Sequence, residues 1–261
     1  MRKIGFILLA LIFVQCQSIG KEPQGGDSLK GKNVLFVYGG WPGHDPVGCR
    51  DLFVPWLQEE GANVTLSDSL GIYKNKEIMS KVDLVIQTWT MGNISPAEEA
   101  GLLEAVRNGA GIAGWHGGLC DAFRNNTEYQ FMTGGQWVAH PGNKIEYTVK
   151  VTDKKDPVTK GIKTFKMNTE QYYVHIDPNV KVLATTECTG KGAEWIKGCI
   201  MPVAWKKIYG KGRVFYSSLS HDANDFKSVP EALEIMKRGI RWAAQSKHQT
   251  TECLINPIYK K

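Results

Sequence analysis

Short apolar runs alternate with amphipathic stretches along the first half of the chain. Residues 34–38 form a continuous apolar run followed by two glycines, which is typical of a buried parallel strand. Shorter apolar runs predict further strands at 64–66, 84–88 and 111–114. Apolar positions in 49–57 recur at helical spacing, although Pro55 counts against an undisturbed helix. A capping box that begins at Ser95 predicts a second helix, which ends near Gly109.

This order of strands and helices predicts an α/β fold with a doubly wound, mostly parallel sheet and helices on both faces. The second half of the chain adds further strand patterns. Strands are expected at 145–151, 182–186, 201–205 and 211–216, and an amphipathic helix at about 230–244. The runs at 182–186 and 201–205 are predicted to pair. We find no internal repeat and no linker past residue 33, which favours one domain over 33–247 and a C-terminal tail at 248–261.

The N-terminus is typical of a targeting signal. Two basic residues precede an apolar run at 4–14 that is too short to span a bilayer but suits a signal peptide. Cys16 after this run predicts a lipoprotein-type signal over 1–16, and the polar, glycine-rich stretch at 17–32 is interpreted as a tether. We therefore expect an exported protein, periplasmic or anchored to the outer membrane through Cys16, with no other membrane contact. Plain secretion and an uncleaved anchor remain alternatives, because Phe13 and Gln15 match the usual lipoprotein pattern poorly.

Composition narrows the classes of partner. With 42% hydrophobic and 22% charged residues, the chain is neither disordered nor collagen-like. The formal net charge of +6 comes without a dense basic patch, so nucleic acid is not an expected partner. A nucleotide cofactor is not expected either, since no glycine-rich phosphate-binding motif follows a strand. A homo-oligomer remains possible.

Histidines follow the predicted strands. His44 comes after the first strand, His116 directly after the fourth and His221 after the strand at 211–216, while His140 ends a segment rich in glycine and tryptophan. Ligands of open α/β sheets bind at the carboxyl ends of the strands, so we expect these side chains to converge on one site. The Gly-x-His-x-Gly turn around His116 resembles a nucleophile elbow, but a histidine there excludes acyl transfer through serine or cysteine at this turn.

These motifs, together with Gly134-Gly135, Glu170 with Tyr172-Tyr173, and the stretch from Pro202 to His221, resemble the ThuA-like (trehalose utilisation) family over residues 33–245. The resemblance implies a class I glutamine amidotransferase-like fold without glutaminase chemistry. It also implies a role in bacterial use of trehalose and related disaccharides, alongside sugar oxidation to 3-keto derivatives. Ser220 departs from the pattern, because glycine is common at that position.

A small-molecule sugar suits the residues near this sheet edge. Tryptophan offers a broad apolar face to a sugar ring, and histidine, aspartate, glutamate and asparagine suit its hydroxyls. The predicted substrate-binding residues are His44, Trp41, Trp89, Trp115, Tyr173, His221 and Asp222.

Two chemistries fit the histidines and a carboxylate. His116, His140 and Glu170 are predicted to be catalytic through general acid–base work. A divalent metal, with zinc the natural choice, is the alternative, and its candidate ligands are His44, His116, His140 and His221. No His-x-His or His-x-x-x-His spacing supports a metal on local grounds. The leading hypothesis is an enzyme acting on a glycoside or 3-keto-sugar; a non-catalytic sugar-binding lipoprotein and a metal-dependent hydrolase of another substrate remain open.

Cysteine spacing gives one further expectation. Cys188 and Cys199 lie just beyond the facing ends of the paired strands at 182–186 and 201–205, with a glycine-rich turn between them. An exported protein meets an oxidising compartment, so a disulfide between these two residues is predicted.

Overall fold

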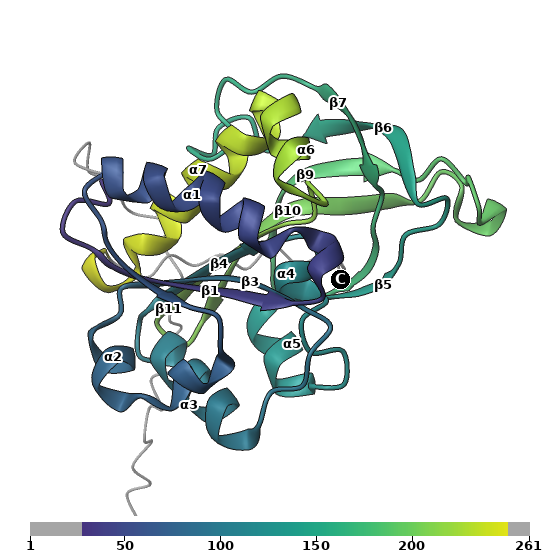
Figure 1. Cartoon of the computed structure of the whole chain (residues 1–261). Coiled ribbons are helices and arrows are strands. Elements are labelled where there is room, and N and C mark those ends of the chain that lie inside the picture. The colour runs from purple at the N-terminus through teal and green to yellow at the C-terminus, as the bar shows by residue number, and fades with distance from the viewer. Residues whose placement is uncertain (1–27, 250–261) are drawn as a thin grey trace, which may run out of the picture.

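A nine-stranded sheet runs through the protein, with strand order β2-β1-β3-β4-β11-β10-β9-β6-β7 (Figure 1). The computed structural model describes residues 28–249. The parallel half of the sheet consists of β2 (Asn63–Ser67), β1 (Asn33–Gly40), β3 (Leu84–Thr90), β4 (Gly111–Trp115) and β11 (Gly212–Ser217). The doubly wound α/β class predicted from the sequence is therefore confirmed.

The antiparallel half extends this sheet from β11. It consists of β10 (Ile200–Tyr209), β9 (Lys181–Glu187), β6 (Lys144–Val151) and β7 (Phe165–Glu170). The predicted pairing of the runs at 182–186 and 201–205 is confirmed, since Met201 lies opposite Thr186 and Trp205 opposite Val182. A separate two-stranded sheet of β5 (Gly135–Ala139) and β8 (Tyr173–Ile176) was not predicted.

Helices cover both faces of the sheet (Figure 1). The upper face in that view carries α1 (Pro46–Glu59), α6 (Ala223–Ser228) and α7 (Pro230–Ala244). The lower face carries α2 (Lys76–Lys81), α3 (Pro96–Arg107) and α5 (Thr127–Thr133). A one-turn helix, α4 (Gly117–Cys120), follows β4 directly. Among residues 28–249, no helix combines the length and apolar character needed to cross a bilayer.

Local sequence explains where the helices begin and why one of them tolerates proline. The Ser95 side chain accepts a hydrogen bond from the Glu98 N–H, and the Glu98 side chain accepts one from the Ser95 N–H. The predicted capping box therefore starts α3. Helix α1 runs on through Pro55, contrary to the doubt that this residue raised. Pro55 and Asp51 are both exposed, so the carbonyl that loses its helical partner is open to water.

Each face of the sheet has its own hydrophobic core, and β1 contributes to both. Val34 and Phe36 belong to the core under α1 and α7, whereas Leu35 and Val37 belong to the core under α3. Alternate side chains of a strand point to opposite faces, so a strand buried on both sides must be apolar throughout. This requirement explains the continuous apolar run at 34–38.

Several of the predicted segments lie at the two ends of the chain. The predicted signal peptide, Cys16 and most of the tether lie outside the described residues, as does most of the predicted tail. Leu29, which the sequence assigned to the tether, is fully buried in the core under α1. The folded domain therefore begins at least as early as this residue.

The predicted disulfide between Cys188 and Cys199 is not present, because both residues are free thiols. The Cys188 N–H donates to the Cys199 carbonyl at 2.8 Å, and the Cys188 carbonyl accepts from the Gly198 N–H at 2.9 Å. Two residues of one strand thus face one residue of the other, as in a β-bulge. The bulge-like pairing offsets the two residues from the directly opposite positions of a regular strand pair. Burial raises the pKa of Cys188, and Cys199 is nevertheless close enough to contribute to this rise.

A buried ion pair joins the antiparallel half of the sheet to the segment after β6. The Lys206 ammonium on β10 lies 2.8 and 2.9 Å from the two Asp156 carboxylate oxygens, and both side chains are only 1% exposed. Lys181 contacts the same carboxylate at 2.8 Å. Burial acts to raise the pKa of Asp156, but the two ammonium groups outweigh it and lower the pKa overall.

We expect Asp156→Ala to lower the free energy of unfolding by about 3–5 kcal/mol, because it leaves the buried Lys206 ammonium without its carboxylate. Urea denaturation followed by circular dichroism measures the change. The control is Glu146→Ala, whose partner Lys166 has a side chain that is 69% exposed; we expect this loss to stay below about 1 kcal/mol. Equal losses in the two variants would contradict the prediction.

Candidate active site

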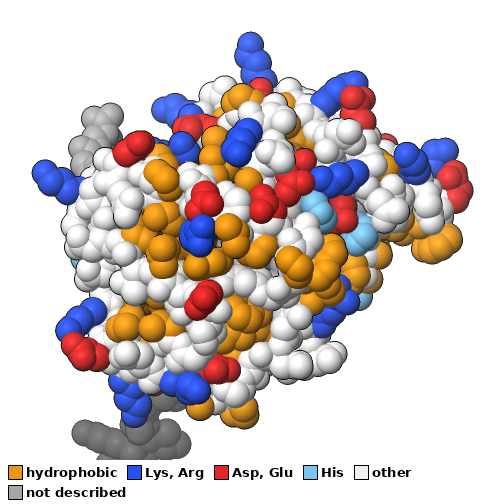
Figure 2. Space-filling model, viewed as in Figure 1, with side chains coloured by type: hydrophobic (Ala, Val, Ile, Leu, Met, Phe, Trp, Pro, Cys, Tyr) orange, Lys and Arg blue, Asp and Glu red, His pale blue; other side chains and the backbone are white. Residues whose placement is uncertain are grey.

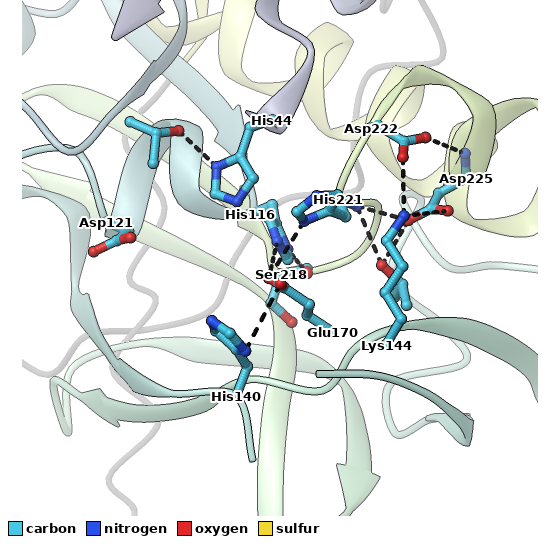
Figure 3. A network of polar contacts seen from close by, with 12 residues as sticks. His44, His116, Asp121, His140, Lys144, Glu170, Ser218, His221, Asp222 and Asp225 are labelled. Carbon is cyan, nitrogen blue, oxygen red and sulfur yellow. Dashed lines mark hydrogen bonds and ion pairs between the residues drawn. The ribbon is translucent and has the colours of Figure 1, made fainter. Parts of the chain in front are cut away.

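Four side chains from distant parts of the sequence meet at the carboxyl edge of the parallel strands (Figure 3). His44 ends the short 3-10 helix η1 (Pro42–His44) that follows β1, His116 follows β4, and His221 follows β11. Glu170 is the last residue of β7, at the far end of the antiparallel half. The expected convergence at this edge is thus present, and the antiparallel strands bring in the carboxylate.

The four groups are close enough to share one small ligand. One ligand atom from each of His44, His116, Glu170 and His221 lies within 4.8 Å of the others. His116 Nε2 lies 3.0 Å from Glu170 Oε2, and His221 Nδ1 lies 3.3 Å from the same oxygen. The imidazole ring centroids of His44 and His221 are 4.7 Å apart.

The glycines beside His116 make this approach possible. His116 has φ 47° and ψ −136°, a strained conformation typical of a sharp turn between strand and helix. A Cβ atom on Gly117 would lie 2.3 Å from His44 Cε1, and one on Gly118 would lie 2.7 Å from the Thr88 Cα. Any side chain at Gly117 would therefore push His44 out of the cluster.

Hydrogen bonds set which ring nitrogens face the cluster. His116 Nδ1 lies 2.9 Å from the Ser218 carbonyl, and since a carbonyl only accepts, this nitrogen carries the proton. Nε2 of a neutral His116 then points its lone pair at Glu170. His44 Nδ1 contacts the Thr90 hydroxyl at 2.8 Å, which leaves Nε2 to face the other side chains (Figure 3).

Burial favours the neutral form of His44 and of His116, and the contacts of Glu170 favour its ionised form. Burial, aided by the charges of His116 and His221, lowers the pKa of His44 from 6.5 to about 3. Burial also lowers the pKa of His116, against the raising effect of its hydrogen bonds to Glu170 and Ser218. For Glu170, burial acts to raise the pKa, but the contacts with His116 and His221 outweigh it and hold the pKa well below its ordinary value.

A lone pair of neutral His116 and an ionised oxygen of Glu170 at 3.0 Å require a positive charge between them. A proton can supply it, but burial disfavours the imidazolium form. A divalent metal bound by neutral imidazoles avoids this cost. Zinc bonds of 2.0–2.2 Å in tetrahedral geometry separate ligand atoms by about 3.4 Å, close to the two separations at Glu170. His221 Nδ1, buried and without a hydrogen-bond partner among the described residues, is available as a ligand.

His140 stands at the outer side of the cluster. Its Nδ1 lies 3.7 Å from Glu170 Oε1, too far for a hydrogen bond, and its side chain is 30% exposed. The ring stacks with Tyr172 at a centroid distance of 6.1 Å. His140 is thus placed to reach both solvent and the carboxylate, unlike the buried His44 and His116.

Two aromatic residues at the site were not among the predicted site residues. Tyr172, rather than its neighbour Tyr173, packs on His116 with ring centroids 4.1 Å apart. Trp137 lies 5.6 Å from the His140 ring, and its buried Nε1–H has no partner among the described residues. Tyr172 directly precedes β8, which begins at Tyr173, so no strand pattern in the sequence marks which of the two tyrosines faces the histidines.

The predicted tryptophans have different surroundings. Trp41 is 42% exposed and lies edge-on to His44 and His221, with ring centroids 4.8 and 6.3 Å away. Trp89 is half-buried against Gly39 of β1. Trp115 is only 2% exposed and packs between Phe53 and Phe226, so its assignment as a substrate-binding residue needs correction. Its side chain faces the core under α1, away from the turn that projects His116.

Two other predicted residues lie beside the cluster. Asp222 is the N-cap of α6 and pairs with Lys144 at 2.9 Å, so its side chain is engaged in capping and an ion pair. Tyr173 is half-buried on β8, next to His175. Histidine atoms are visible on the surface in Figure 2. The cluster is reached from solvent through the partly exposed side chains of His140, His221 and Glu170, which are 30%, 13% and 11% exposed.

The fold and site define an α/β protein of the doubly wound type with a histidine–carboxylate centre at the carboxyl edge of its strands. The family model for ThuA (trehalose utilisation) matches residues 33–243. The chain belongs to this family.

Solved structures show the same fold. A protein described as ThuA-like from Bacteroides uniformis has a TM-score of 0.70 at 16% identity, over 90% of this chain and 100% of that one. A ThuA-like protein from Parabacteroides merdae has a TM-score of 0.66 at 17% identity, over 87% and 96%. The cytoplasmic protein STM3548 of Salmonella typhimurium gives 0.58 at 14% identity, over 81% and 98%. A search of curated proteins gave no match.

We expect the free energy of unfolding of the metal-free protein to decrease as the pH is lowered from 7.5 to 5.5. Part of this decrease comes from the lowered pKa of His44. The unfolded chain protonates His44 near its ordinary pKa of 6.5, whereas the folded chain does so only near 3. Stability is therefore lost as the pH falls through this window, by about 1 kcal/mol from His44 at pH 5.5. Urea denaturation in the presence of chelator should show a smaller pH dependence for His44→Gln. The control His175→Gln, at an exposed position, should keep the wild-type dependence. An unchanged pH dependence in His44→Gln would contradict the prediction.

Proposed function

We propose that the protein is an enzyme that acts on a glycoside or 3-keto-sugar at a divalent-metal centre. The observation that carries the metal is the gathering of one ligand atom each from His44, His116, Glu170 and His221 within 4.8 Å of one another. His44 and His221 complete a set of three imidazoles and one carboxylate, which suits zinc or a similar transition metal. When bound, the ion would supply Lewis-acid polarisation of a substrate oxygen.

The exposure of each remaining side chain at the site suggests its role. His140 is the partly exposed imidazole beside the cluster, so it is the residue that donates or accepts a proton at the substrate. Tyr172 packs on both His116 and His140 and fixes their rings. Trp41, exposed beside His44 and His221, offers an apolar face to a sugar ring.

The sugar substrate is supported by the family and by this residue set. The family model describes trehalose utilisation. A site that can polarise a carbonyl oxygen and move a proton next to it suits proton abstraction α to a keto group or cleavage of a keto-glycosidic bond. Both reactions act on a 3-keto-sugar. Glutaminase chemistry is not part of the proposal, since histidine occupies the position of the nucleophile at the turn after β4.

Metal content and turnover test the proposal together. Protein purified without chelator should contain about one equivalent of a divalent transition metal by elemental analysis, and His116→Ala and Glu170→Gln should lower this content at least tenfold. Incubation with 3-keto-glycosides should yield product. His140→Asn should keep the metal but lose most turnover, and the exposed His175→Asn serves as the control that keeps both.

The outcomes separate the alternatives. Less than one-tenth of an equivalent of metal would contradict the metal centre. Saturable sugar binding without product would favour a sugar-binding protein. Turnover of other substrates, with none of keto-sugars, would favour a hydrolase of another class.

We also propose that the protein is exported and lipid-anchored through Cys16, on the strength of the signal pattern at 1–16. Cells that express the full chain should incorporate labelled palmitate into it, and Cys16→Ser should abolish the label. Labelling that persists in the variant, or wild-type protein found without label in the cytoplasm, would refute the anchor.

A further inference from the structure

Two of the proposed ligands come from strands that are far apart in the sheet. His221 follows β11, whereas Glu170 ends β7, and β10, β9 and β6 lie between these strands. No hydrogen bond of the sheet joins these two strands directly. The distance between His221 and Glu170 is therefore set by contacts above the sheet edge.

One carboxylate oxygen connects the two ligand-bearing segments. Asp225 Oδ2, on α6, accepts a hydrogen bond from the His221 backbone N–H at 2.8 Å and from the Thr169 hydroxyl at 2.6 Å. Thr169 is fully buried and directly precedes Glu170. The Thr169 oxygen also lies 3.2 Å from the His221 nitrogen, so the three groups form a closed triangle.

The position of His221 depends on its hydrogen bond to Asp225, whereas the positions of His44 and His116 are set by other partners. His44 and His116 are held at the ring by Thr90 and Ser218, respectively. His221 Nδ1 has no hydrogen-bond partner among the described residues, although Glu170 is 3.3 Å away. The preceding residue, Ser220, has φ 72°, a left-handed backbone conformation that residues other than glycine seldom adopt. The backbone just before His221 is thus strained, and Asp225 accepts a hydrogen bond from the His221 N–H.

Lys144 compensates the charge of Asp225. Its ammonium lies 3.8 Å from Asp225 Oδ1 and 2.9 Å from Asp222, as Figure 3 shows beside the histidines. Lys144 is also the residue opposite Glu170 in the register of β6 and β7. The acidic pair on α6 is therefore joined to the same strand pair that carries Glu170.

We infer that Asp225 is a positioning residue that sets the distance between His221 and Glu170 by holding the His221 backbone and Thr169 on one oxygen. Its effect on metal affinity rests on the proposed metal centre, whereas its hold on His221 does not. Outer-shell partners of metal ligands change metal affinity by about 10–100-fold when removed. We expect the same range for Asp225.

The test measures Co²⁺ affinity by competition and the visible spectrum of the cobalt-loaded protein. Asp225→Ala should weaken Co²⁺ binding at least tenfold and change the spectrum. Asp225→Asn retains an acceptor oxygen and should stay within about threefold of the wild type. Thr169→Val should weaken binding and Thr169→Ser should not, because serine keeps the hydroxyl. The matched control is Asn224→Ala, at an exposed position in the same helix.

A second readout works without any metal. Amide hydrogen exchange of His221, followed by NMR in the metal-free protein, should become at least tenfold faster in Asp225→Ala and unchanged in Asn224→Ala. If the wild type binds no metal, the proposed function fails and this exchange rate alone decides the role of Asp225. Unchanged exchange in Asp225→Ala would overturn the inference, as would Co²⁺ affinities within twofold of the wild type in both Asp225→Ala and Thr169→Val. If Asp225→Ala does not fold, Thr169→Val decides on both readouts.

Discussion

The site is organised by the contact between His116 and Glu170, an imidazole and a carboxylate whose facing atoms need a proton or a metal ion between them. The Ser218 carbonyl accepts a hydrogen bond from Nδ1 of His116, so in the neutral imidazole the other ring nitrogen faces the carboxylate with its lone pair, 3.0 Å away. Burial disfavours a second proton on the ring. The surrounding structure, from the glycines of the turn to the partners of His44, holds further nitrogen atoms around the same point.

The two halves of the sheet contribute different parts of this arrangement. The parallel half supplies the imidazoles of His44, His116 and His221 from the loops that follow its strands, as ligand sites of doubly wound sheets generally do. The antiparallel half supplies the carboxylate from β7. His140 comes from a third element, the small sheet of β5 and β8. The parallel half alone would hold the imidazoles without the anion that sets their chemistry.

The sequence predicts the parallel half well because each of its strands is buried on both faces and therefore apolar throughout, as β1 demonstrates. It also predicts which histidines converge, since strand ends in a parallel sheet share one edge. Other features depend on tertiary packing that no local pattern records. Trp115 lies one residue before the projected His116 and yet faces the core. Tyr172 packs on His116 from the position just before the four-residue strand β8, and Asp225 acts through a backbone N–H that any residue other than proline at position 221 would provide.

The bond between His116 and Ser218 joins residues 102 positions apart, and this separation has a consequence for how the protein is made. During synthesis, β4 and the turn after it emerge long before β11, which must pair with β4 on one side and β10 on the other. Until β11 pairs, nothing fixes the tautomer of His116, and contacts of such long range form slowly. The chain would therefore complete nearly all of its chemistry-bearing sequence before it could hold the proposed metal ion, so premature capture of that ion by a half-made chain is disfavoured.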